Sequence, residues 1–240
     1  MKRTVILSTN DVEDYKACLP YVQQAWNKLG WHTLTFYLGN DDIKSTDRNL
    51  IINIDPIENV RDATVVQVSR LFAHKYIDGM IMTSDVDMMP LTDYWSPEED
   101  TFTCYGRDLT EHHYPICYIA AKKELWDALI PEESIKEILE KFNQYKSETF
   151  DKWWYVDQDI VTSRLKELKE LKIKEIKRGK QLYQYKRDGM IFSHENALGR
   201  IDRNCWLPTK NHGHTPKIDS HLPRPFDKNT VESLLSEFLK

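Results

Sequence analysis

Short apolar segments alternate with helical patterns through the first 95 residues, and this alternation constrains the fold most strongly. Apolar, often β-branched runs predict strands at 4–8, 34–38, 50–54 and 80–83. Apolar residues recur at helical spacing over 12–29 and 65–76, and Pro20 is expected to divide the first of these helices or to begin a second one. Such an alternation predicts an α/β fold, with a mainly parallel, twisted sheet and helices on both faces.

The second half of the chain is less regular. Strands are expected near 101–105 and 116–120, and helices near 122–130, 134–147, 155–168 and 230–239. Residues 164–180 hold eight Lys or Arg against three Asp or Glu, which predicts a solvated helix. A basic face toward a phosphate-rich partner or a membrane surface is the alternative for this stretch. Residues 200–226, with four prolines, predict a long ordered loop that could close over a ligand.

No repeat or linker divides the sequence, so we expect a single domain over 1–240, with a nucleotide-binding half at 1–95 and an acceptor half at 96–240. The 240 residues include 33 Lys plus Arg and 38 Asp plus Glu, and the net charge of −5 argues against nucleic acid as a partner. No apolar run approaches the roughly 20 residues that span a bilayer.

The four cysteines do not form a CxxC pair, which argues against a zinc ribbon. We expect buried free thiols, with disulfides as the alternative. The first residues, MKRTVILSTNDVEDY, predict a strand followed by a polar loop rather than a signal peptide. A cytoplasmic location is the resulting expectation.

Two carboxylates, Asp85 and Asp87, follow the apolar strand Met80–Thr83. Residues separated by one position point to the same side of an extended chain, so these carboxylates converge. Convergent carboxylates repel each other unless a cation lies between them. Mg²⁺ and Mn²⁺ prefer such hard oxygen ligands and keep positions open for diphosphate oxygens. The motif therefore indicates a divalent cation site at a strand end, where α/β folds bind ligands.

With these pieces in place, the sequence resembles the GT-A glycosyltransferases, which are nucleotide-sugar transferases with a DxD metal site. The matching segments are 5–10 (first strand and uridine-binding loop), 66–73 (helix before the DxD strand), 85–87 (DxD), 153–159 (tryptophan and Asp-Gln segment) and 218–224 (late histidine loop). The pattern is also similar to small glycosyltransferases of large algal viruses, for which the compartment would be the host cytoplasm.

The resemblance implies a metal site built from Asp85, Asp87 and a late histidine. Asp87 would ligate the metal directly, and Asp85 would ligate it or bind the donor. His221 is the first candidate for the third ligand, because it stands in the Asp-Ser-His-Leu-Pro-Arg run, and His212 and His214 are the alternatives. An imidazole ligand favours Mn²⁺ over Mg²⁺.

The resemblance and the positions at strand ends also imply a set of residues that bind the nucleotide-sugar. They are Thr9, Asn10, Asp11, Tyr15, Arg70, Ser84, Asp85, Arg107, Asp108, Lys210 and Arg224. Asp11 and Tyr15 would hold the uracil ring, and Arg70 would pair with phosphate. The turn at 106–108 would reach the donor sugar, while Lys210 and Arg224 would neutralise the diphosphate. A helix cap, a core position, a turn or a solvated charge is the alternative at these positions.

Asp157 and Gln158 are the candidate catalytic residues by the same resemblance. A carboxylate near the reacting sugar carbon can stabilise an oxocarbenium-like centre, act as a nucleophile or position the acceptor hydroxyl. A helix cap beside core tryptophans is the alternative for Asp157. The predicted function is metal-dependent transfer of a sugar from a UDP-sugar, or another nucleoside-diphosphate sugar, to a hydroxyl group of a glycan or other acceptor, with retention of configuration.

Two other functions remain open on the sequence. A phosphohydrolase of the haloacid-dehalogenase kind also places DxD after a strand and uses the first Asp as the nucleophile. That motif usually opens the chain and carries Thr or Val after the second Asp, whereas Met88 stands here. The other alternative is a domain that binds a nucleotide or sugar without turnover.

Overall fold

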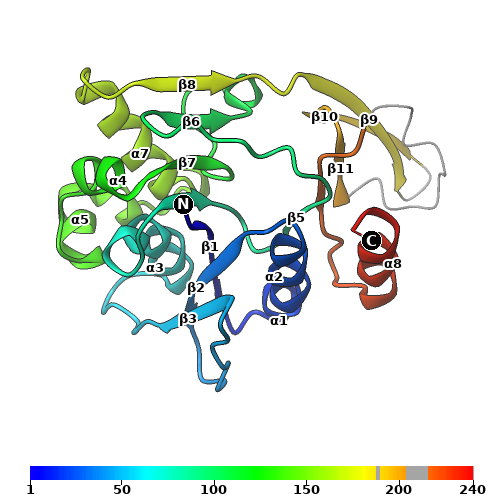
Figure 1. The fold of residues 1–240 in the computed structure, drawn as a ribbon, viewed down its shortest axis with the longest axis horizontal. Coiled ribbons are helices and arrows are strands. Elements are labelled where there is room, and N and C mark those ends of the chain that lie inside the picture. Colours follow the sequence, from blue (N-terminus) through cyan, green and yellow to red (C-terminus); the bar gives the residue numbers. More distant parts are fainter. Residues whose placement is uncertain (188–189, 204–215, 240) are drawn as a thin grey trace.

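The computed structural model describes residues 1–187, 190–203 and 216–239 (Figure 1). Its strands are β1 Arg3–Asn10, β2 His32–Leu38, β3 Asn49–Asn53, β4 Met80–Thr83, β5 Met88–Pro90, β6 Phe102–Tyr105, β7 Ile119–Lys122, β8 Ile173–Ile176, β9 Lys180–Arg187, β10 Met190–Ala197, β11 Arg200–Ile201 and β12 Asp219–His221. Its α-helices are α1 Glu13–Lys16, α2 Leu19–Lys28, α3 Asp62–Ser69, α4 Lys123–Leu129, α5 Ile135–Lys141, α6 Phe150–Trp154, α7 Val156–Glu167 and α8 Lys228–Phe238. The 3₁₀ turns are η1 Arg70–Lys75, η2 Arg107–Leu109 and η3 Asn143–Lys146.

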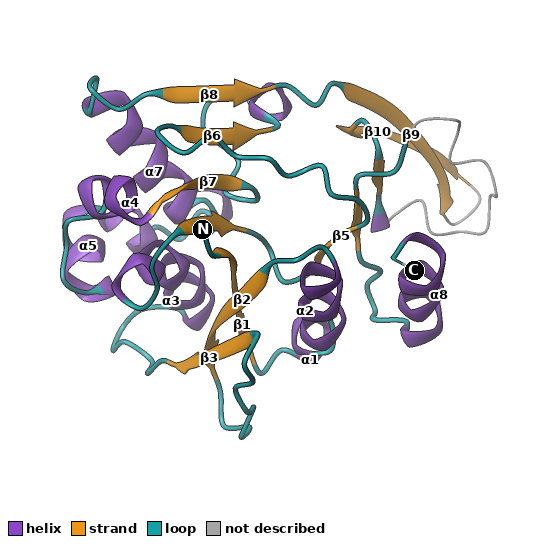
Figure 2. Cartoon of the chain, viewed as in Figure 1, coloured by secondary structure: helices purple, strands orange, loops and turns teal. Residues whose placement is uncertain are grey.

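Within the described ranges, the central sheet has seven strands in the order β3-β2-β1-β4-β7-β6-β8 (Figure 2). Strand β7 is antiparallel to both of its neighbours, and the other neighbouring strands pair in parallel. Strands β11, β12 and β5 form a small second sheet, and β9 pairs with β10. This arrangement confirms the predicted α/β fold with a mainly parallel sheet.

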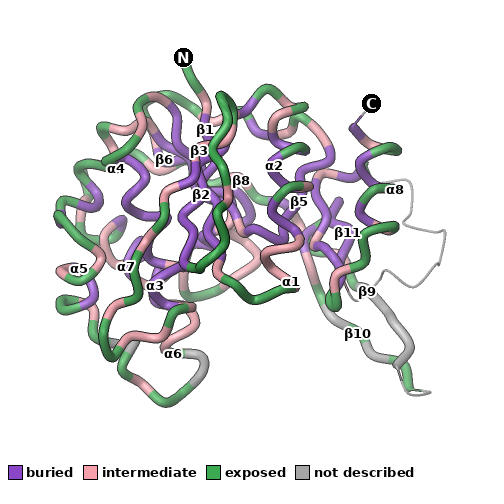
Figure 3. Tube along the Cα trace, turned by 90° about the horizontal axis from the view of Figure 1, so that it is seen from below, coloured by how far each residue is buried: buried purple, intermediate pink, exposed green. Residues whose placement is uncertain are grey.

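Alternate side chains of β1 enter two different cores, which explains why this strand is apolar throughout. Val5 and Leu7 belong to the core beside α2 and α8, whereas Ile6 belongs to the core beside α4 and α7. Figures 1 and 3 show α3, α4, α5 and α7 on one side of the sheet and α1, α2 and α8 on the other. Helices on both faces are thereby confirmed, and the strands between them are buried.

The first helical stretch is divided as the proline predicts. Helix α2 carries Pro20 in its first turn, where a missing N–H costs no hydrogen bond. The helix is followed by Gly30 at a φ of +80°, a conformation that suits glycine. The side chains of Val22 and Trp26, one helical turn apart, are fully buried against the sheet.

The basic stretch 164–180 does not form the expected helix beyond residue 167. Helix α7 ends at Glu167, and the chain then adds β8 in parallel to β6. The backbone N–H of Phe102 donates to the Lys172 carbonyl at 2.9 Å, which starts this ladder. A charged segment can serve as an edge strand because its ladder uses backbone groups. Arg164 and Lys166 therefore belong to α7, Lys174 to β8 and Lys180 to β9, and the other basic residues of the stretch lie in the segments between these elements.

The end of this stretch carries a buried cluster of three charges. Arg178 donates two hydrogen bonds to the carboxylate of Asp219, at 2.6 and 3.1 Å, and Arg200 donates two more at 3.2 and 3.0 Å. All three residues are buried. Asp219 thereby joins β12 to β11 and to the segment that follows β8. In its described residues, 200–203 and 216–226, the predicted long loop contains the short strands β11 and β12, which the contact of Arg200 with Asp219 joins.

Two further differences concern the predicted elements, and the first is the stretch 134–147, where α5 ends at Lys141 and the 3₁₀ turn η3 follows. The strand expected over 116–120 starts at Ile119, because Tyr118 has a φ of +74° and interrupts the extended chain. Cys18, Cys104 and Cys117 are free thiols, and Cys205 lies outside the described residues. In the ranges described above, no helix combines the length and the apolar character needed to cross a membrane.

Candidate active site

A cavity of about 490 Å³ opens at the carboxyl ends of β1 and β4. Its size is within the roughly 300–1,000 Å³ of small-molecule sites. The predicted site residues that line it are Thr9, Asn10, Tyr15, Arg70, Asp85, Asp87, Asp157, Gln158, His221 and Arg224. Groups from residue 9 to residue 224 therefore converge at the edge of the sheet where α/β folds bind ligands.

The turn after β4 positions the two carboxylates of the DxD motif. The N–H of Ser84 donates to the Ile6 carbonyl at 2.9 Å, which extends the pairing with β1 by one residue. The N–H of Met88 then donates to the Asp85 carbonyl at 3.1 Å and closes the turn. Because the turn is tied on both sides, Asp85 and Asp87 face the cavity without depending on a ligand.

Arg70 lies between two carboxylates of the cavity. Its Nη1 atom donates to Asp85 Oδ1 at 2.5 Å, while Nε and Nη2 donate to Asp157 Oδ2 at 3.1 and 2.6 Å. The Arg70 side chain is 6% exposed, so its charge is held by these partners rather than by water. This guanidinium contacts Asp85 and Asp157 in the structure, and its predicted pairing with phosphate stays a prediction.

Asp157 is fully buried at the start of α7. The N–H of Gln158 donates to its Oδ1 at 2.8 Å, so both carboxylate oxygens are occupied. Burial raises the pKa of Asp157, and the neighbouring Arg70 offsets only part of this effect. A carboxylate that is buried, oriented and raised in pKa is typical of a functional position.

Asp87 is surrounded by positive groups from the C-terminal part of the chain. Its Oδ2 atom accepts hydrogen bonds from Arg203 Nη2 at 2.8 Å and from Arg224 Nη2 at 2.5 Å. The Nε2 atom of His221 lies 3.4 Å from the same oxygen. Burial alone would raise the pKa of Asp87, but His221, Arg203 and Arg224 outweigh it and lower the pKa below its ordinary value.

Arg224 also covers the ring of Tyr15. Its guanidinium carbon lies 3.9 Å from the ring centroid, which is a cation–π contact. The chain around Arg224 is fastened to α1, because the N–H of Phe226 donates to Asp14 Oδ1 at 3.0 Å. Burial raises the pKa of the Tyr15 phenol. Arg224 therefore covers one face of the Tyr15 ring at the end of the cavity that also holds Asp87.

The donors at Asp87 and His221 fit one divalent cation. Carboxylate oxygen and imidazole nitrogen are ligand types that Mn²⁺ accepts. Two ligands about 2.1 Å from an octahedral ion lie about 3 Å apart, close to the 3.4 Å between Asp87 Oδ2 and His221 Nε2. Asp85 is turned toward Arg70, and the described residues do not assemble three acidic, histidine or cysteine ligands into one cluster.

Four predicted binding residues in the described ranges do not line the cavity. The carboxylate of Asp11 accepts hydrogen bonds from the Tyr37 hydroxyl and the Asn40 N–H, so it shapes the loop after β2. Ser84 is buried beneath the cavity, where its carbonyl accepts from Arg70. The other two are Arg107 and Asp108. Arg107 stacks over Tyr114 and donates to the Thr110 carbonyl, and Asp108 accepts from the N–H groups of Arg178 and Gly179. The predicted residues Lys210, His212 and His214 lie outside the described residues.

Sequence reasoning missed Arg203 and Tyr155, and it favoured a core position for Trp154 over a sugar-stacking face. Arg203 stands in an irregular stretch with no motif around it. It reaches Asp87 because β11 pairs in parallel with β12, which brings Arg203 beside His221. Trp154 and Tyr155 line the cavity at the junction of α6 and α7. Their position directly before Asp157 was the available signal.

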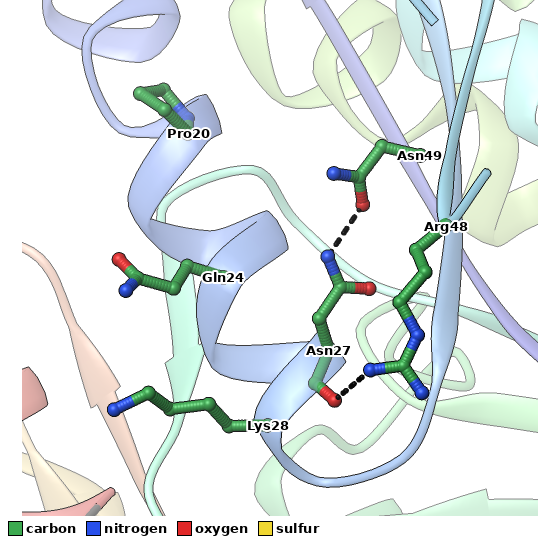
Figure 4. A pocket seen from close by; sticks show the side chains of 6 residues that line it. All are labelled: Pro20, Gln24, Asn27, Lys28, Arg48 and Asn49. Atoms are coloured by element: carbon green, nitrogen blue, oxygen red, sulfur yellow. Dashed lines mark hydrogen bonds between the residues drawn. The ribbon is translucent and has the colours of Figure 1, made fainter. Parts of the chain in front are cut away.

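A second hollow of about 430 Å³ lies between α2 and the start of β3 (Figure 4). Asn27 donates to the Asn49 side chain at 2.8 Å, and Arg48 donates to the Asn27 carbonyl at 3.0 Å. The residues lining this hollow do not include a carboxylate. Its hydrogen bonds tie the end of a helix to an edge strand, which is a structural role.

No family model matches the chain, and no curated protein matches it. The glycosyltransferase GlyE of Streptococcus pneumoniae TIGR4 aligns with 73% of this chain and 45% of its own, at 14% identity and a TM-score of 0.46. Its apo form aligns over the same shares at 13% identity and a TM-score of 0.47. An active-site mutant of LgtC aligns with 65% of this chain and 70% of its own, at 12% identity and a TM-score of 0.43. The chain thus spans less than half the length of GlyE, and likenesses of this degree do not assign a function.

Proposed function

We propose that the protein is a metal-dependent glycosyltransferase that moves a sugar from a UDP-sugar, or another nucleoside-diphosphate sugar, to a hydroxyl group of a glycan. The observation that carries this proposal is the convergence of Asp85, Asp87 and Asp157 on one cavity beside three arginines. A cavity with both charges supports binding of a donor that carries a diphosphate and a cation. The proposal also draws on the resemblance of the DxD and Asp-Gln segments to GT-A enzymes.

In this proposal the two ends of the cavity have different tasks. Thr9, Asn10 and the ring of Tyr15 bind the nucleoside, and Arg203 and Arg224 bind the diphosphate. Asp87 and His221 would hold Mn²⁺ or Mg²⁺, which would supply charge stabilisation to the departing diphosphate when bound. The two arginines add fixed positive charge at the same place, where it stabilises the leaving group in the transition state.

Asp157 and Gln158 act at the reacting carbon. The anomeric carbon loses its bond to the diphosphate oxygen and gains one to the acceptor oxygen, while the acceptor proton leaves with the diphosphate. A buried carboxylate beside this carbon stabilises its developing positive charge. Arg70 keeps the Asp157 carboxylate in one orientation through two hydrogen bonds. We propose retention of anomeric configuration for this reaction.

A DxD phosphohydrolase is the alternative function. In that class the first aspartate attacks phosphorus and needs an accessible oxygen with an available lone pair. Here Asp85 Oδ1 accepts a hydrogen bond from Arg70 at 2.5 Å, and the Asp85 side chain is 38% exposed. Phosphate release from phosphate esters therefore distinguishes the two functions.

Calorimetric titration of UDP tests the proposal, with and without Mn²⁺, on the wild-type protein and on Asp87→Ala. Tight binding that needs both Mn²⁺ and Asp87 is the expected result, and it would be followed by a screen of UDP-sugars with oligosaccharide acceptors. Nuclear magnetic resonance of the product then reads the anomeric configuration. Absence of UDP binding together with steady phosphate release from phosphate esters would contradict the proposal, and an inverted product would reject retention.

A further inference from the structure

The single negative charge of the Asp87 carboxylate is shared between two positively charged guanidinium groups, those of Arg203 and Arg224. Arg203 and Arg224 both donate to Oδ2, and the Asp87 side chain is 6% exposed, so water screens these contacts little. Two guanidinium groups thus contact one carboxylate directly, and the carboxylate of Asp202 lies 3.6 Å from His221 Nδ1 on the side away from Asp87 Oδ2. At the other end of the cavity Arg70 lies between Asp85 and Asp157, and that group sums to −1.

This separation of charge indicates where an anion binds. A diphosphate is the most negative part of the proposed donor, and it fits beside the arginine pair rather than beside Asp85 and Asp157. The arginines, however, already occupy the carboxylate that the divalent cation requires. Arg203, Arg224 and the cation are therefore alternative partners of the same Asp87 oxygen.

We propose that Asp87 holds Arg203 and Arg224 as counter-ions in the donor-free protein, and that cation and diphosphate exchange these pairings together. Asp87 and His221 would then hold the cation, and both guanidinium groups would donate to diphosphate oxygens. This inference rests on the proposed function and assigns to Arg203 a role that the sequence did not reveal. Because each ligand removes the obstacle to the other, Mn²⁺ and UDP bind with positive cooperativity.

Each arginine has a second contact besides the one with Asp87. Arg203 Nε donates to His221 Nδ1 at 3.1 Å, and the Arg224 guanidinium carbon lies 3.9 Å from the Tyr15 ring centroid. The contact with Tyr15 keeps Arg224 in the cavity when Asp87 changes partner. The contact of Arg203 with His221 ends at the same step, because an imidazole that ligates a cation through Nε2 carries its proton on Nδ1, and this leaves the Arg203 guanidinium available to the diphosphate. The exchange thus needs rotation of side chains and no rearrangement of the strands that carry them.

The experiment measures binding of Mn²⁺ alone by electron paramagnetic resonance and of UDP, with and without Mn²⁺, by calorimetry. Wild type is compared with Arg203→Gln, Arg224→Gln and the matched charge control Arg48→Gln. Arg48 is exposed and lies in the second hollow, outside the candidate site (Figure 4). In wild type, Mn²⁺ is expected to tighten UDP binding by more than about tenfold, within the usual range of coupling between two ligands.

Removal of either arginine is expected to move the two affinities in opposite directions. Mn²⁺ alone should bind about three- to tenfold tighter, since one competitor and one positive charge are gone. UDP in the presence of Mn²⁺ should bind about tenfold weaker, since one donor to the diphosphate is gone. The coupling between Mn²⁺ and UDP therefore falls, whereas Arg48→Gln behaves as wild type.

The outcomes separate this inference from the proposed function. Cooperative binding of UDP and Mn²⁺ that is unchanged in both arginine variants, or weaker Mn²⁺ binding in both, would overturn the exchange and leave the glycosyltransferase intact. Absence of UDP binding to wild type would overturn both. Circular dichroism checks that each variant is folded. Arg203→Lys keeps the charge without the planar fork, so intermediate coupling is expected if Arg203→Gln does not fold.

Discussion

Arg70 and Asp157 lie 87 positions apart in the chain and meet through two hydrogen bonds to a single carboxylate oxygen, Oδ2. Arg70 comes from the turn that follows α3, and Asp157 from the start of α7. The contact joins two helices behind the cavity and carries a third bond, from Nη1, to Asp85. One guanidinium group therefore fixes the relative position of the DxD turn and the candidate catalytic carboxylate.

Arg70→Lys is expected to lower kcat by about 100-fold, because displacement of a reacting group by about 1 Å has an effect of this size. Lysine keeps the charge but cannot bond Asp85 and Asp157 through a planar fork. UDP affinity in the presence of Mn²⁺ should change little, since Arg70 faces carboxylates rather than the diphosphate. Steady-state kinetics and calorimetry provide the two readouts, with Arg48→Lys as the control. Loss of UDP affinity with normal kcat would show that Arg70 binds the donor directly.

The acid limb of the activity profile should lie above the ordinary range of an aspartate. Burial raises the pKa of Asp157, and its proposed role requires the ionised form. As pH falls through this raised pKa, kcat is expected to fall, with a midpoint above the reference value of about 3.9. The raised pKa of Asp157 also contributes to folding stability. This contribution is fully present below the pKa of Asp157 in the unfolded chain and is lost as pH rises through its pKa in the folded protein.

The pH dependence of kcat for wild type and Asp157→Glu checks this assignment. The glutamate variant is expected to retain an acid limb at reduced activity, and Asp157→Asn to show little activity at any pH. An unshifted limb in the wild type, or activity in Asp157→Asn equal to wild type, would remove Asp157 from the reaction.

Asp219→Asn is expected to lower the free energy of unfolding at pH 7 by about 3–5 kcal/mol, because it leaves two buried arginines with a neutral partner. Arg178 and Arg200 hold the pKa of Asp219 well below its ordinary value, against burial, which acts in the opposite direction. The contribution of the Asp219 carboxylate to folding stability is therefore fully present above its unfolded-state pKa of about 3.9. It is lost as pH falls toward the lower pKa that Asp219 has in the folded protein.

Urea unfolding of wild type and Asp219→Asn across pH 7 to 3 measures this effect, with the exposed cap residue Asp227 changed to Asn as the control. The difference between wild type and Asp219→Asn should shrink as the solution becomes acidic. A difference that is constant over this range would mean that the charge of Asp219 does not cause the destabilisation.

Trp154→Ala is expected to raise the KM for the acceptor several-fold and to leave the affinity for UDP unchanged. Trp154 lines the cavity beside Gln158, in the part of the lining that α6 and α7 supply, whereas Tyr15 and Arg224 mark the nucleotide end. An aromatic face suits the C–H side of a sugar ring. Acceptor kinetics at saturating donor provide the measurement, and Trp154→Phe is the matched variant that keeps a face. A change confined to UDP affinity would place Trp154 at the donor.

Most elements of the first 90 residues were predictable, because the apolar residues of each segment follow either the pattern of a strand or that of a helix. Strand β4 lies where the run at 80–83 predicts it, and the carboxylates that follow it face the cavity. Asp11 occupies an equivalent strand end, but the Tyr37 hydroxyl and the Asn40 N–H hold it in a loop. A strand end alone therefore does not decide which polar side chain reaches a site.

Pairing between distant segments could not be predicted from local pattern. Strand β8 forms because its backbone completes the edge beside β6, although its charges are typical of a solvated helix. Arg203 joins the site through the two-residue ladder between β11 and β12, which leaves no periodic signal in the sequence. Residues whose roles depend on such short pairings become visible only in three dimensions.

The span of the candidate site along the chain, from Ser8 to Arg224, has a consequence for how binding competence arises during folding. Contacts between distant segments form slowly, because closing long loops costs entropy before the contacts stabilise the chain. Helices and the β1–β2 pair use local sequence and can form early, whereas the cavity requires the last strand to dock beside β5. During refolding, recovery of nucleotide binding should therefore lag behind recovery of secondary structure.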